Sequence, residues 1–397
     1  MESAPTYKPE RVIRVMKRKQ LPTPCYVVDE AKIEANCQIL RGVMDRTGCQ
    51  ILLAQKAFSL FALYPLIGKY LVGAASSGLY EARLAQEYFP GESHVFSAAF
   101  RPDDFPEILG YADKIIFNSI GQLRQYGTMA REAGLSVGLR VNPEHSTQDG
   151  SGIYDPCAPG SRLGVTRAQF DLYKGAPGAS RPTLDGLHFH TLCQQGAAPL
   201  VETVAAFEER FGEFLYGLDW INLGGGHHIT RAGYDIAALE ACIRHLADTY
   251  GVTIYLEPGE AIALNAGVLE TTVLDIVQNG DTQIAILDAS AACHMPDVIE
   301  MPYRPPLFDS GLPGERAYTY RLAGMTCLSG DVIGDYSFDA PLQIGDRLTF
   351  GDMAIYTMVK NNTFNGMPLP SIWVEGADGE CRLIRVFGYA DFKMRLG

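Results

Sequence analysis

Several patterns that mark common protein classes are missing from this sequence of 397 residues. Lysine and arginine number 33 against 46 acidic residues, and the resulting net charge of −13 argues against nucleic acid or an anionic membrane as the main partner. A cationic small molecule suits this charge, although many proteins are acidic simply to stay dispersed. No segment is apolar over the length that a membrane span needs, and residues 1–20 lack the apolar core of a secretory signal.

Paired cysteines are also absent. The nine cysteines are odd in number and include no C-x-x-C pair, so we predict neither a disulfide framework nor a zinc knuckle. We therefore expect a cytoplasmic protein in a reducing compartment. Apolar residues make up 47% of the chain and charged residues 20%, which is the balance of a globular protein long enough for two domains.

From residue 25 to residue 264, short apolar runs alternate with segments of helical spacing. The apolar runs cover 51–54, 71–75, 94–98, 114–117, 137–141, 186–189, 220–223 and 253–256. Amphipathic segments such as 78–88 and 201–216 lie between them, and buried strands joined by helices pair in parallel. Eight repeats of this length predict an α/β fold, a (β/α)8 barrel of the TIM type. A doubly wound open sheet is the alternative, because periodicity does not reveal closure.

The pattern changes near residue 265. Segments 268–277, 283–287, 317–322, 347–350 and 372–375 are short, β-rich and separated by glycine and proline. They predict a C-terminal antiparallel β domain formed by residues 265–397 together with residues 1–24, since Pro22 and Pro24 mark the start of the barrel.

Lys56 ends the run Ile51-Leu-Leu-Ala-Gln-Lys56, at the carboxyl end of a predicted strand, where α/β barrels place their active sites. A lysine there is commonly a solvated strand cap. It is also where an aldehyde cofactor binds, because partial burial lowers the pKa of the amine and favours an imine.

Three glycines, Gly224, Gly225 and Gly226, follow the strand at 220–223. Their backbone N–H groups predict a phosphate-binding loop, with a tight turn as the alternative. The neighbouring His227 and His228 do not indicate a metal site, because adjacent side chains point apart and no carboxylate stands at ligand spacing.

Three further side chains end predicted strands. Glu257 follows the strand at 253–256 and suits a protonated ring nitrogen, although it is equally a solvated acid. His190 closes the run Gly186-Leu-His-Phe-His190, where it would stack on a flat ring or simply fill the core. Arg140 belongs either to a buried ion pair or to a cofactor contact.

The order of these pieces resembles the fold-type III pyridoxal-phosphate decarboxylases, the group that includes ornithine and diaminopimelate decarboxylases. Two motifs of the β domain strengthen the resemblance: Gly324-Met-Thr-Cys327-Leu-Ser-Gly-Asp331 is similar to the cysteine motif of the group, and Asp352-Met-Ala-Ile-Tyr356, with Thr363-Phe-Asn-Gly366, to its tyrosine motif. The resemblance implies an alanine racemase-like fold with pyridoxal 5'-phosphate as cofactor and no metal.

Within this group the chain departs from the commoner patterns. Glu260 stands where diaminopimelate enzymes carry arginine, and Leu328 stands where an acid is usual. The strings Phe189-His190-Thr-Leu-Cys193, Leu223-Gly-Gly-Gly-His-His-Ile-Thr230 and Cys293-His-Met-Pro-Asp297 look most like the carboxynorspermidine decarboxylase subfamily. An anion at residue 260 suits an ammonium group rather than a distal carboxylate.

This resemblance implies decarboxylation of carboxynorspermidine or carboxyspermidine to norspermidine or spermidine. Lys56 would hold the cofactor, Glu257 would keep its ring acidic and His190 would stack on it, while Cys327 would return a proton. The cofactor contacts implied are Arg140, Gly224, Gly225, Gly226 and Tyr356, and the substrate contacts are Glu260, Asp331, Cys327 and, more weakly, Asp288. Family members place the cysteine in the neighbouring subunit's site, which implies a homodimer.

Three other functions fit parts of the pattern. A racemase of the same barrel type would use Lys56 without releasing carbon dioxide. A diaminopimelate or other basic amino-acid decarboxylase would form a different amine. A non-catalytic relative would bind a partner, although such proteins typically lack a working lysine or glycine loop.

Overall fold

Eight parallel strands form a closed barrel in the unit that spans residues 32–264. The computed structural model describes residues 15–148, 155–175 and 183–397. Each strand overlaps one of the eight predicted runs, so the prediction of a (β/α)8 barrel is confirmed and the open sheet is excluded. The barrel strands are β3 (Gln50–Ala54), β4 (Gly73–Ser76), β5 (Glu92–Phe96), β6 (Lys114–Phe117), β7 (Ser136–Arg140), β8 (Gly186–His188), β9 (Trp220–Asn222) and β10 (Thr253–Leu256).

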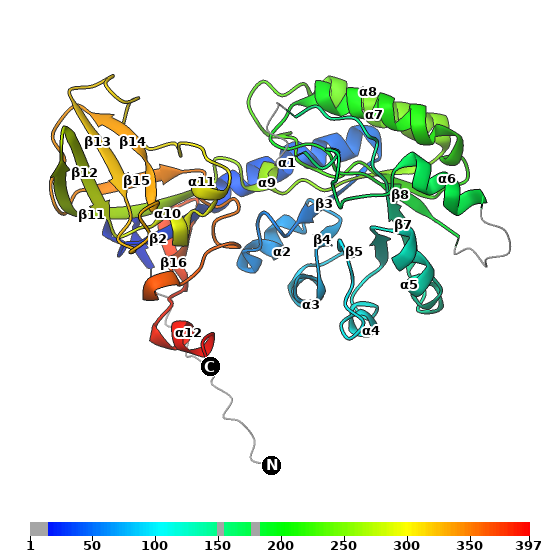
Figure 1. Ribbon diagram of the computed structural model, residues 1–397, viewed down its shortest axis with the longest axis horizontal. Coiled ribbons are helices and arrows are strands. Elements are labelled where there is room, and N and C mark those ends of the chain that lie inside the picture. The colour runs from blue at the N-terminus through cyan, green and yellow to red at the C-terminus, as the bar shows by residue number, and fades with distance from the viewer. Residues whose placement is uncertain (1–14, 149–154, 176–182) are drawn as a thin grey trace, which may run out of the picture. The chain divides into compact units, whose positions relative to one another are not determined.

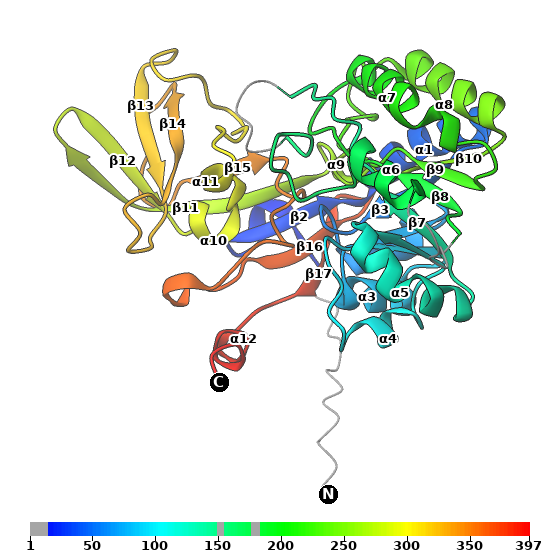
Figure 2. The ribbon, with the colours of Figure 1, turned by 45° about the vertical axis from the view of Figure 1, so that its right-hand side comes forward.

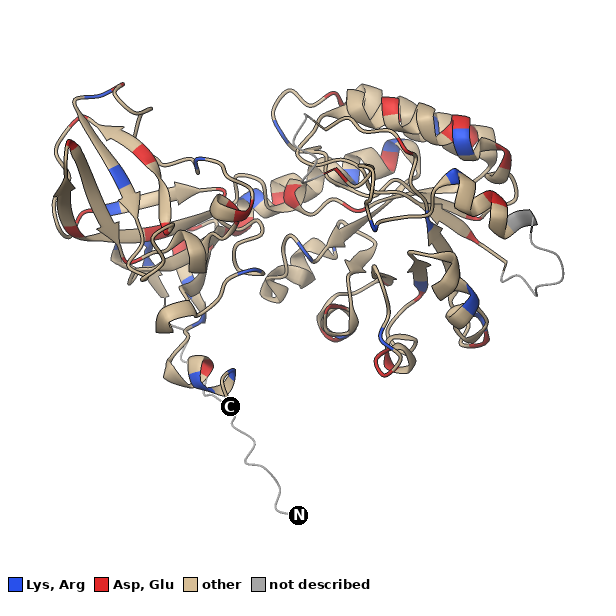
Figure 3. Cartoon of the chain, in the orientation of Figure 1, with Lys and Arg blue, Asp and Glu red and all other residues tan. Residues whose placement is uncertain are grey.

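Helices follow the strands around the barrel (Figures 1 and 2). Strands β10 and β3 close it by pairing Tyr255 with Gln50 and Leu256 with Ile51. Figure 3 shows acidic and basic residues along α7 and α8, as expected for helices with one face in solvent. The helices of this region are α1 (Glu30–Thr47), α2 (Tyr64–Ile67), α3 (Leu79–Tyr88), α4 (Phe105–Ile108), α5 (Ile120–Glu132), α6 (Arg167–Gly175), α7 (Ala197–Phe211), α8 (Ile236–Tyr250) and α9 (Glu260–Ala263).

Trp220 is fully buried in the barrel, and two glycines make room for its indole ring. A Cβ atom at Gly186 would lie 2.1 Å from this ring, and one at Gly138 would lie 2.3 Å from it. The ring packs with Tyr255 in a small apolar cluster, and its nitrogen donates to Ser136 Oγ at 2.9 Å. These glycines are therefore explained by packing.

The second unit combines residues 15–31 with residues 265–397 and contains a nine-stranded sheet. Most neighbours are antiparallel, as predicted, but β12 with β13 and β16 with β2 pair in parallel. Figure 2 shows β11 and β12 as a long hairpin. The strands are β1 (Val15–Lys17), β2 (Cys25–Asp29), β11 (Gly267–Asn279), β12 (Thr282–Leu287), β13 (Tyr318–Ala323), β14 (Val332–Phe338), β15 (Arg347–Gly351), β16 (Ser371–Glu375) and β17 (Glu380–Arg385); the helices are α10 (Ala291–His294), α11 (Asp297–Glu300) and α12 (Tyr389–Met394).

Residues 25–29, which the sequence pattern assigned to the barrel, form β2 in the middle of this sheet. The strand pairs with β11 on one side and β16 on the other. Cys25, Tyr26, Val27 and Val28 are all buried, so the run has the continuous apolar character of a barrel strand. The pairing partner, which the sequence pattern does not specify, decides where the run belongs. No helix in the described part of the chain is long and apolar enough to cross a membrane.

Candidate active site

The predicted barrel residues lie at the carboxyl ends of its strands. Arg140 ends β7, His190 follows β8 by two residues, Lys56 follows β3 by two residues, and Glu257 directly follows β10. Because all eight strands are parallel, these positions meet at the same end of the barrel.

A chain of hydrogen bonds joins Lys56, His190 and Gly225. The Gly225 N–H donates to His190 Nδ1 at 3.0 Å, and His190 Nε2 lies 3.4 Å from Lys56 Nζ. Because Nδ1 accepts a hydrogen bond, a neutral His190 carries its proton on Nε2. The Nε2–H group therefore points toward the Lys56 amine. Because the amine is then the hydrogen-bond acceptor, the geometry favours its deprotonated form.

The electrostatics of the two side chains agree with this geometry. Lys56 is open to solvent, yet it lies among enough protein atoms for desolvation to lower its pKa, and the charge of Arg140 lowers the pKa further. Desolvation and the charges of Lys56 and Arg140 also hold the pKa of His190 well below its usual range. An accessible amine with a lowered pKa is a nucleophile suited to an aldehyde.

Glu257 is held as an anion. Its Oε1 accepts from Asn222 Nδ2 at 2.6 Å, and its Oε2 lies 3.4 Å from His188 Nε2. Burial alone would raise the pKa of this carboxyl, but the interactions with His188, His94 and Asn222 outweigh it and lower the pKa to about 2. A carboxylate fixed in this way is suited to hold a cationic ring nitrogen.

Arg140 forms no ion pair within the described residues, so the first of its two predicted environments, a buried ion pair, is not found. It donates from NH2 to the backbone carbonyl of His190 at 2.9 Å, and its guanidinium lies 4.8 Å from the Phe96 ring centroid. Burial lowers its pKa to about 10, and the charge of Glu257 opposes this shift. Arg140 thus fixes the backbone that carries His190, while its cofactor contact stays a prediction.

The glycine loop is required by close packing. A Cβ at Gly225 would lie 2.1 Å from the carbonyl oxygen of Glu257, and one at Gly226 would lie 1.8 Å from that of Leu192. The N–H of Gly224 donates to Asn222 Oδ1 at 2.8 Å, as that of Gly225 does to His190. Two of the three predicted phosphate donors are therefore already used within the protein.

Glu260 is buried against a histidine. Its Oε2 contacts His228 Nε2, and Nδ1 of the same ring contacts Arg231. The carboxylate therefore carries one internal partner, and its remaining acceptor capacity decides whether it binds an amine. Its role in binding substrate stays a prediction.

The other predicted residues lie in the second unit. Cys327 is exposed, and its backbone N–H donates to Asn365 Oδ1 at 2.7 Å. Tyr356 is partly buried and has a positive φ of 53°, a backbone conformation that is uncommon outside glycine and is enriched at functional sites. The roles that the resemblance implies for both residues stay predictions.

Asp288 and Asp331 both accept hydrogen bonds from other residues of this unit. Asp288 accepts from the Thr271 hydroxyl at 2.5 Å and from the Thr272 N–H at 2.9 Å. Asp331, only 3% exposed, accepts from the hydroxyls of Ser290 and Thr326 and from two backbone N–H groups. These bonds give both acids structural roles, and their contacts with the substrate stay predictions.

Comparison with known proteins places these observations in a family. The family model described as pyridoxal-dependent decarboxylase, C-terminal sheet domain, matches residues 25–354. The chain belongs to this family. It is 39% identical to a carboxynorspermidine/carboxyspermidine decarboxylase of Campylobacter jejuni, covering 95% of this chain and 99% of the relative, and 42% identical to a carboxyaminopropylagmatine decarboxylase of Synechocystis, covering 95% and 96%.

Solved structures of decarboxylases have the same fold. The C. jejuni carboxynorspermidine decarboxylase complexed with norspermidine superposes with a TM-score of 0.85 at 39% identity, over 94% of this chain and all of that one. A Helicobacter pylori diaminopimelate decarboxylase has a TM-score of 0.80 at 19% identity, covering 95% of this chain and 97% of the other, which shows the shared fold alone.

Several groups around the predicted ones in this decarboxylase family member were not predicted from the sequence. His188 and Asn222 contact Glu257, and Glu81 and Cys193 are close enough to act on the charge of Lys56. His188 and Asn222 were detectable, since each is a polar residue inside an apolar strand run. Glu81 had no such signal, because it lies in an ordinary amphipathic helix.

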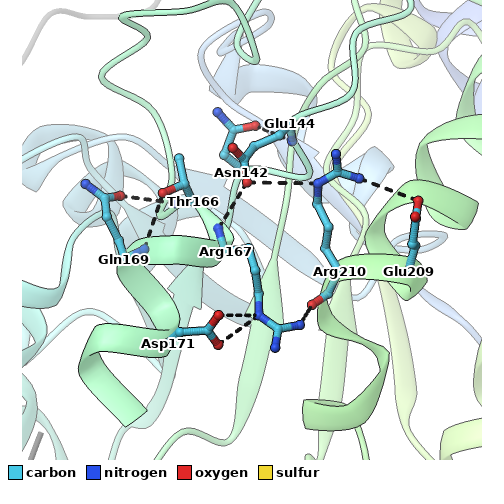
Figure 4. Close-up of polar contacts among 8 residues, drawn as sticks. All are labelled: Asn142, Glu144, Thr166, Arg167, Gln169, Asp171, Glu209 and Arg210. Atoms are coloured by element: carbon cyan, nitrogen blue, oxygen red, sulfur yellow. Dashed lines mark hydrogen bonds and ion pairs between the residues drawn. The ribbon is translucent and has the colours of Figure 1, made fainter. Parts of the chain in front are cut away.

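A cluster of polar and charged side chains in the same family member is joined by hydrogen bonds and ion pairs (Figure 4). Glu144 accepts from the backbone N–H of Arg167 at 3.2 Å and lies 3.9 Å from Arg210 Nε, while Arg167 Nε donates to Asp171 at 2.8 Å. Arg167 also donates to the backbone carbonyl of Arg210. The cluster ties the segment after β7 to α6 and α7, and we assign it no ligand.

Proposed function

We propose that the chain decarboxylates a carboxylated polyamine, carboxynorspermidine or carboxyspermidine, with pyridoxal 5'-phosphate bound at Lys56. The products would be norspermidine or spermidine. Two relatives with about two-fifths of their residues identical, each matched over almost its full length, carry out decarboxylations named for closely related substrates.

One observation carries the proposal: at one end of the barrel, an accessible amine of lowered pKa lies beside a neutral imidazole and close enough to a fixed carboxylate to feel its charge. Lys56 Nζ, His190 and Glu257 provide these three groups. They fit a cationic aromatic aldehyde, because the amine bonds the aldehyde, the imidazole covers a flat ring and the carboxylate pairs with its nitrogen.

When bound, the cofactor supplies an electron-poor ring that accepts the electron pair released by the leaving carboxylate. The chain's own residues do the rest. Lys56 would hold the cofactor at its aldehyde carbon and Glu257 would face its ring nitrogen, while Gly225 and Arg140 hold His190 in its orientation. Within the glycine loop, Gly226 is the glycine whose N–H is left for the phosphate.

The proposed class of substrate is supported by the negative charge of Glu260. Norspermidine-type substrates carry ammonium groups beyond the reacting carbon, and the chain has Glu260 in place of a cation there. Carboxyaminopropylagmatine is a second candidate substrate, because the Synechocystis relative is 42% identical and is named for it. A guanidinium and an ammonium tail both favour an acidic pocket, so charge alone does not separate them.

Offering all candidate substrates together is the direct test. Purified protein with pyridoxal 5'-phosphate would receive carboxynorspermidine, carboxyspermidine, carboxyaminopropylagmatine and diaminopimelate at equal concentration, and mass spectrometry would follow each product. We expect a triamine first. Lysine as the main product would overturn the substrate proposal, and inversion without loss of carbon dioxide would indicate a racemase.

Lys56→Ala tests the cofactor bond separately. We expect loss of the visible absorbance of bound cofactor and at least about a hundredfold loss of activity. Lys69→Ala, which changes an exposed lysine of the same unit, should retain both. Full activity in the Lys56 variant would refute the proposal.

We also propose that the protein is a homodimer in the cytoplasm. Cys327 is exposed on its own unit, as a residue that serves a partner's site would be. Mixing the Lys56→Ala and Cys327→Ala proteins should restore about a quarter of the wild-type activity, beyond what the two variants show separately, if each site combines both subunits. Light scattering that shows a monomer would contradict the shared site.

A further inference from the structure

His188 is a buried histidine that the proposed reaction leaves without a task. It is 1% exposed, it lies on β8 inside the barrel, and neither ring nitrogen has a hydrogen-bond partner in the part of the chain that the structure describes. Buried polar groups are nearly always hydrogen-bonded, so an imidazole left in this state requires an explanation.

The nearest polar group to His188 is the carboxylate of Glu257. His188 Nε2 lies 3.4 Å from Oε2, while Asn222, its register neighbour on β9, donates to Oε1 at 2.6 Å. The two side chains therefore face one oxygen each. An ionised carboxylate accepts about four hydrogen bonds, so both oxygens keep capacity for a ligand.

Burial keeps His188 neutral. Burial lowers its pKa, and the nearby cations Arg140 and Lys56 lower it further against the opposing effect of Glu257. The remaining neighbours are His190, whose own pKa is lowered, and the Phe96 ring, with its centroid 5.6 Å away. A neutral imidazole has one N–H to give, and the carboxylate is the acceptor within reach of Nε2.

We propose that His188 is a positioning residue. Together with Asn222, it determines whether the proton shared by Glu257 and the cofactor's ring nitrogen lies on the carboxylate or on the nitrogen. A donor on the carboxylate makes Glu257 the weaker base, so the proton moves from Glu257 to the ring nitrogen and stays there. Without that donor Glu257 becomes more basic and takes the proton back. This inference rests on the proposed cofactor site.

The barrel provides a matched control in His94. It is also a buried histidine, on β5, but its Nε2 lies 2.9 Å from Glu92 and its ring packs 4.8 Å from the Tyr255 ring. Replacing it removes an imidazole of similar burial without removing the direct neighbour of Glu257.

The test measures proton position by ¹⁵N NMR on cofactor labelled at the ring nitrogen and bound to wild type, His188→Phe, His188→Gln and His94→Phe. We expect the signal of His188→Phe to move toward that of a neutral pyridine, and kcat to fall about tenfold. His188→Gln, which keeps an N–H donor, should recover most of the wild-type signal, and His94→Phe, which acts on Glu257 through charge without contacting it, should shift the signal less than His188→Phe does.

Two results would overturn the inference while sparing the proposed function: an unchanged ring-nitrogen signal in cofactor-loaded His188→Phe, or an equal change in His94→Phe. Failure of the wild-type protein to bind the cofactor would instead refute the proposed function. If His188→Phe does not fold, His188→Gln against His188→Asn gives the same comparison, because the shorter amide is expected to lose contact with Oε2.

Discussion

Glu257 in the barrel and Asp331 in the sheet unit are both buried acids after or beside a strand, yet their surroundings differ. Asp331 accepts hydrogen bonds from two hydroxyls and two backbone N–H groups, which use its acceptor capacity within the protein. Glu257 accepts one short bond, from Asn222, and has a histidine 3.4 Å away. A saturated carboxylate builds structure, whereas an under-satisfied one is kept for a ligand.

The largest effect that we expect from this difference between Glu257 and Asp331 is on catalysis. Glu257→Gln keeps the shape of the side chain but removes the charge that holds the ring nitrogen, so we expect kcat to fall roughly a thousandfold, about 4 kcal/mol. Steady-state kinetics with saturating cofactor would measure it.

Glu240 supplies the control for Glu257. It is a barrel-unit acid of similar burial whose oxygens are bound by Arg46 and Arg244. Glu240→Gln should lower stability and keep kcat. Equal kinetic losses in the two variants would remove the distinction between ligand-binding and structural acids.

The next effect is on folding. Asp331→Ala leaves four donors without their acceptor, so we expect the free energy of unfolding to fall by about 3 kcal/mol. Urea denaturation would measure it, with Asp331→Asn as the milder variant. Asp335→Ala, which breaks only a surface pair with Arg321, should cost less than about 1 kcal/mol.

If Asp331→Ala retains wild-type stability but loses substrate affinity, the substrate role implied by the resemblance is right and the structural interpretation is wrong. The Michaelis constant for the triamine precursor therefore has to be measured beside the unfolding curve.

The same contrast explains what the sequence could predict. Runs of apolar residues locate all eight barrel strands, and the positions just after them locate Lys56, His190 and Glu257. That step needs only parallel pairing, which brings the carboxyl ends together. Strands β14 and β17 were missed, because Gly334, Asp335 and the charged residues of 380–385 hide them.

Contacts between residues that are far apart in the sequence could not be predicted from such patterns. Asp331 is bound by Ser290, 41 residues away, and Glu260 by His228, 32 residues away. Whether an acid is free or already satisfied depends on such pairs, so its type and place along the chain do not reveal its role. Residues 25–29 illustrate the same limit, since their strand partners come from 267–270 and 371–375.

Acid pH should affect both units through buried histidines. Burial lowers the pKa of His227 in the barrel to about 4 and also, against a hydrogen bond to Pro368, that of His294 in the sheet unit. Because the unfolded forms have a pKa near 6.5, each group's contribution is complete above pH 6.5 and is lost as pH falls toward 4. Between pH 7 and pH 5 we expect a loss of about 2 kcal/mol for each histidine.

Urea unfolding of wild type and His294→Gln at pH 7 and pH 5 would measure this loss. The variant should show the smaller pH dependence, and the same dependence in both proteins would contradict the expected protonation. His245, which is exposed beside Glu208, is the control position, because its replacement should leave the pH dependence unchanged within about 0.5 kcal/mol.

The smallest effect on stability is expected at Cys327, next to the turn that Asp331 holds. The turn is held through the backbone N–H of Cys327, bound to Asn365, and through Thr326, bound to Asp331; neither bond uses the exposed thiol. Cys327→Ala should therefore change the free energy of unfolding by less than about 0.5 kcal/mol, whereas Cys381→Ala, in the apolar core of the sheet, should cost more. Turnover should nevertheless slow, or the returning proton should be diverted, which product analysis by mass spectrometry would detect. Unchanged kinetics with unchanged stability would leave Asp331 holding a turn whose thiol has no role in the reaction.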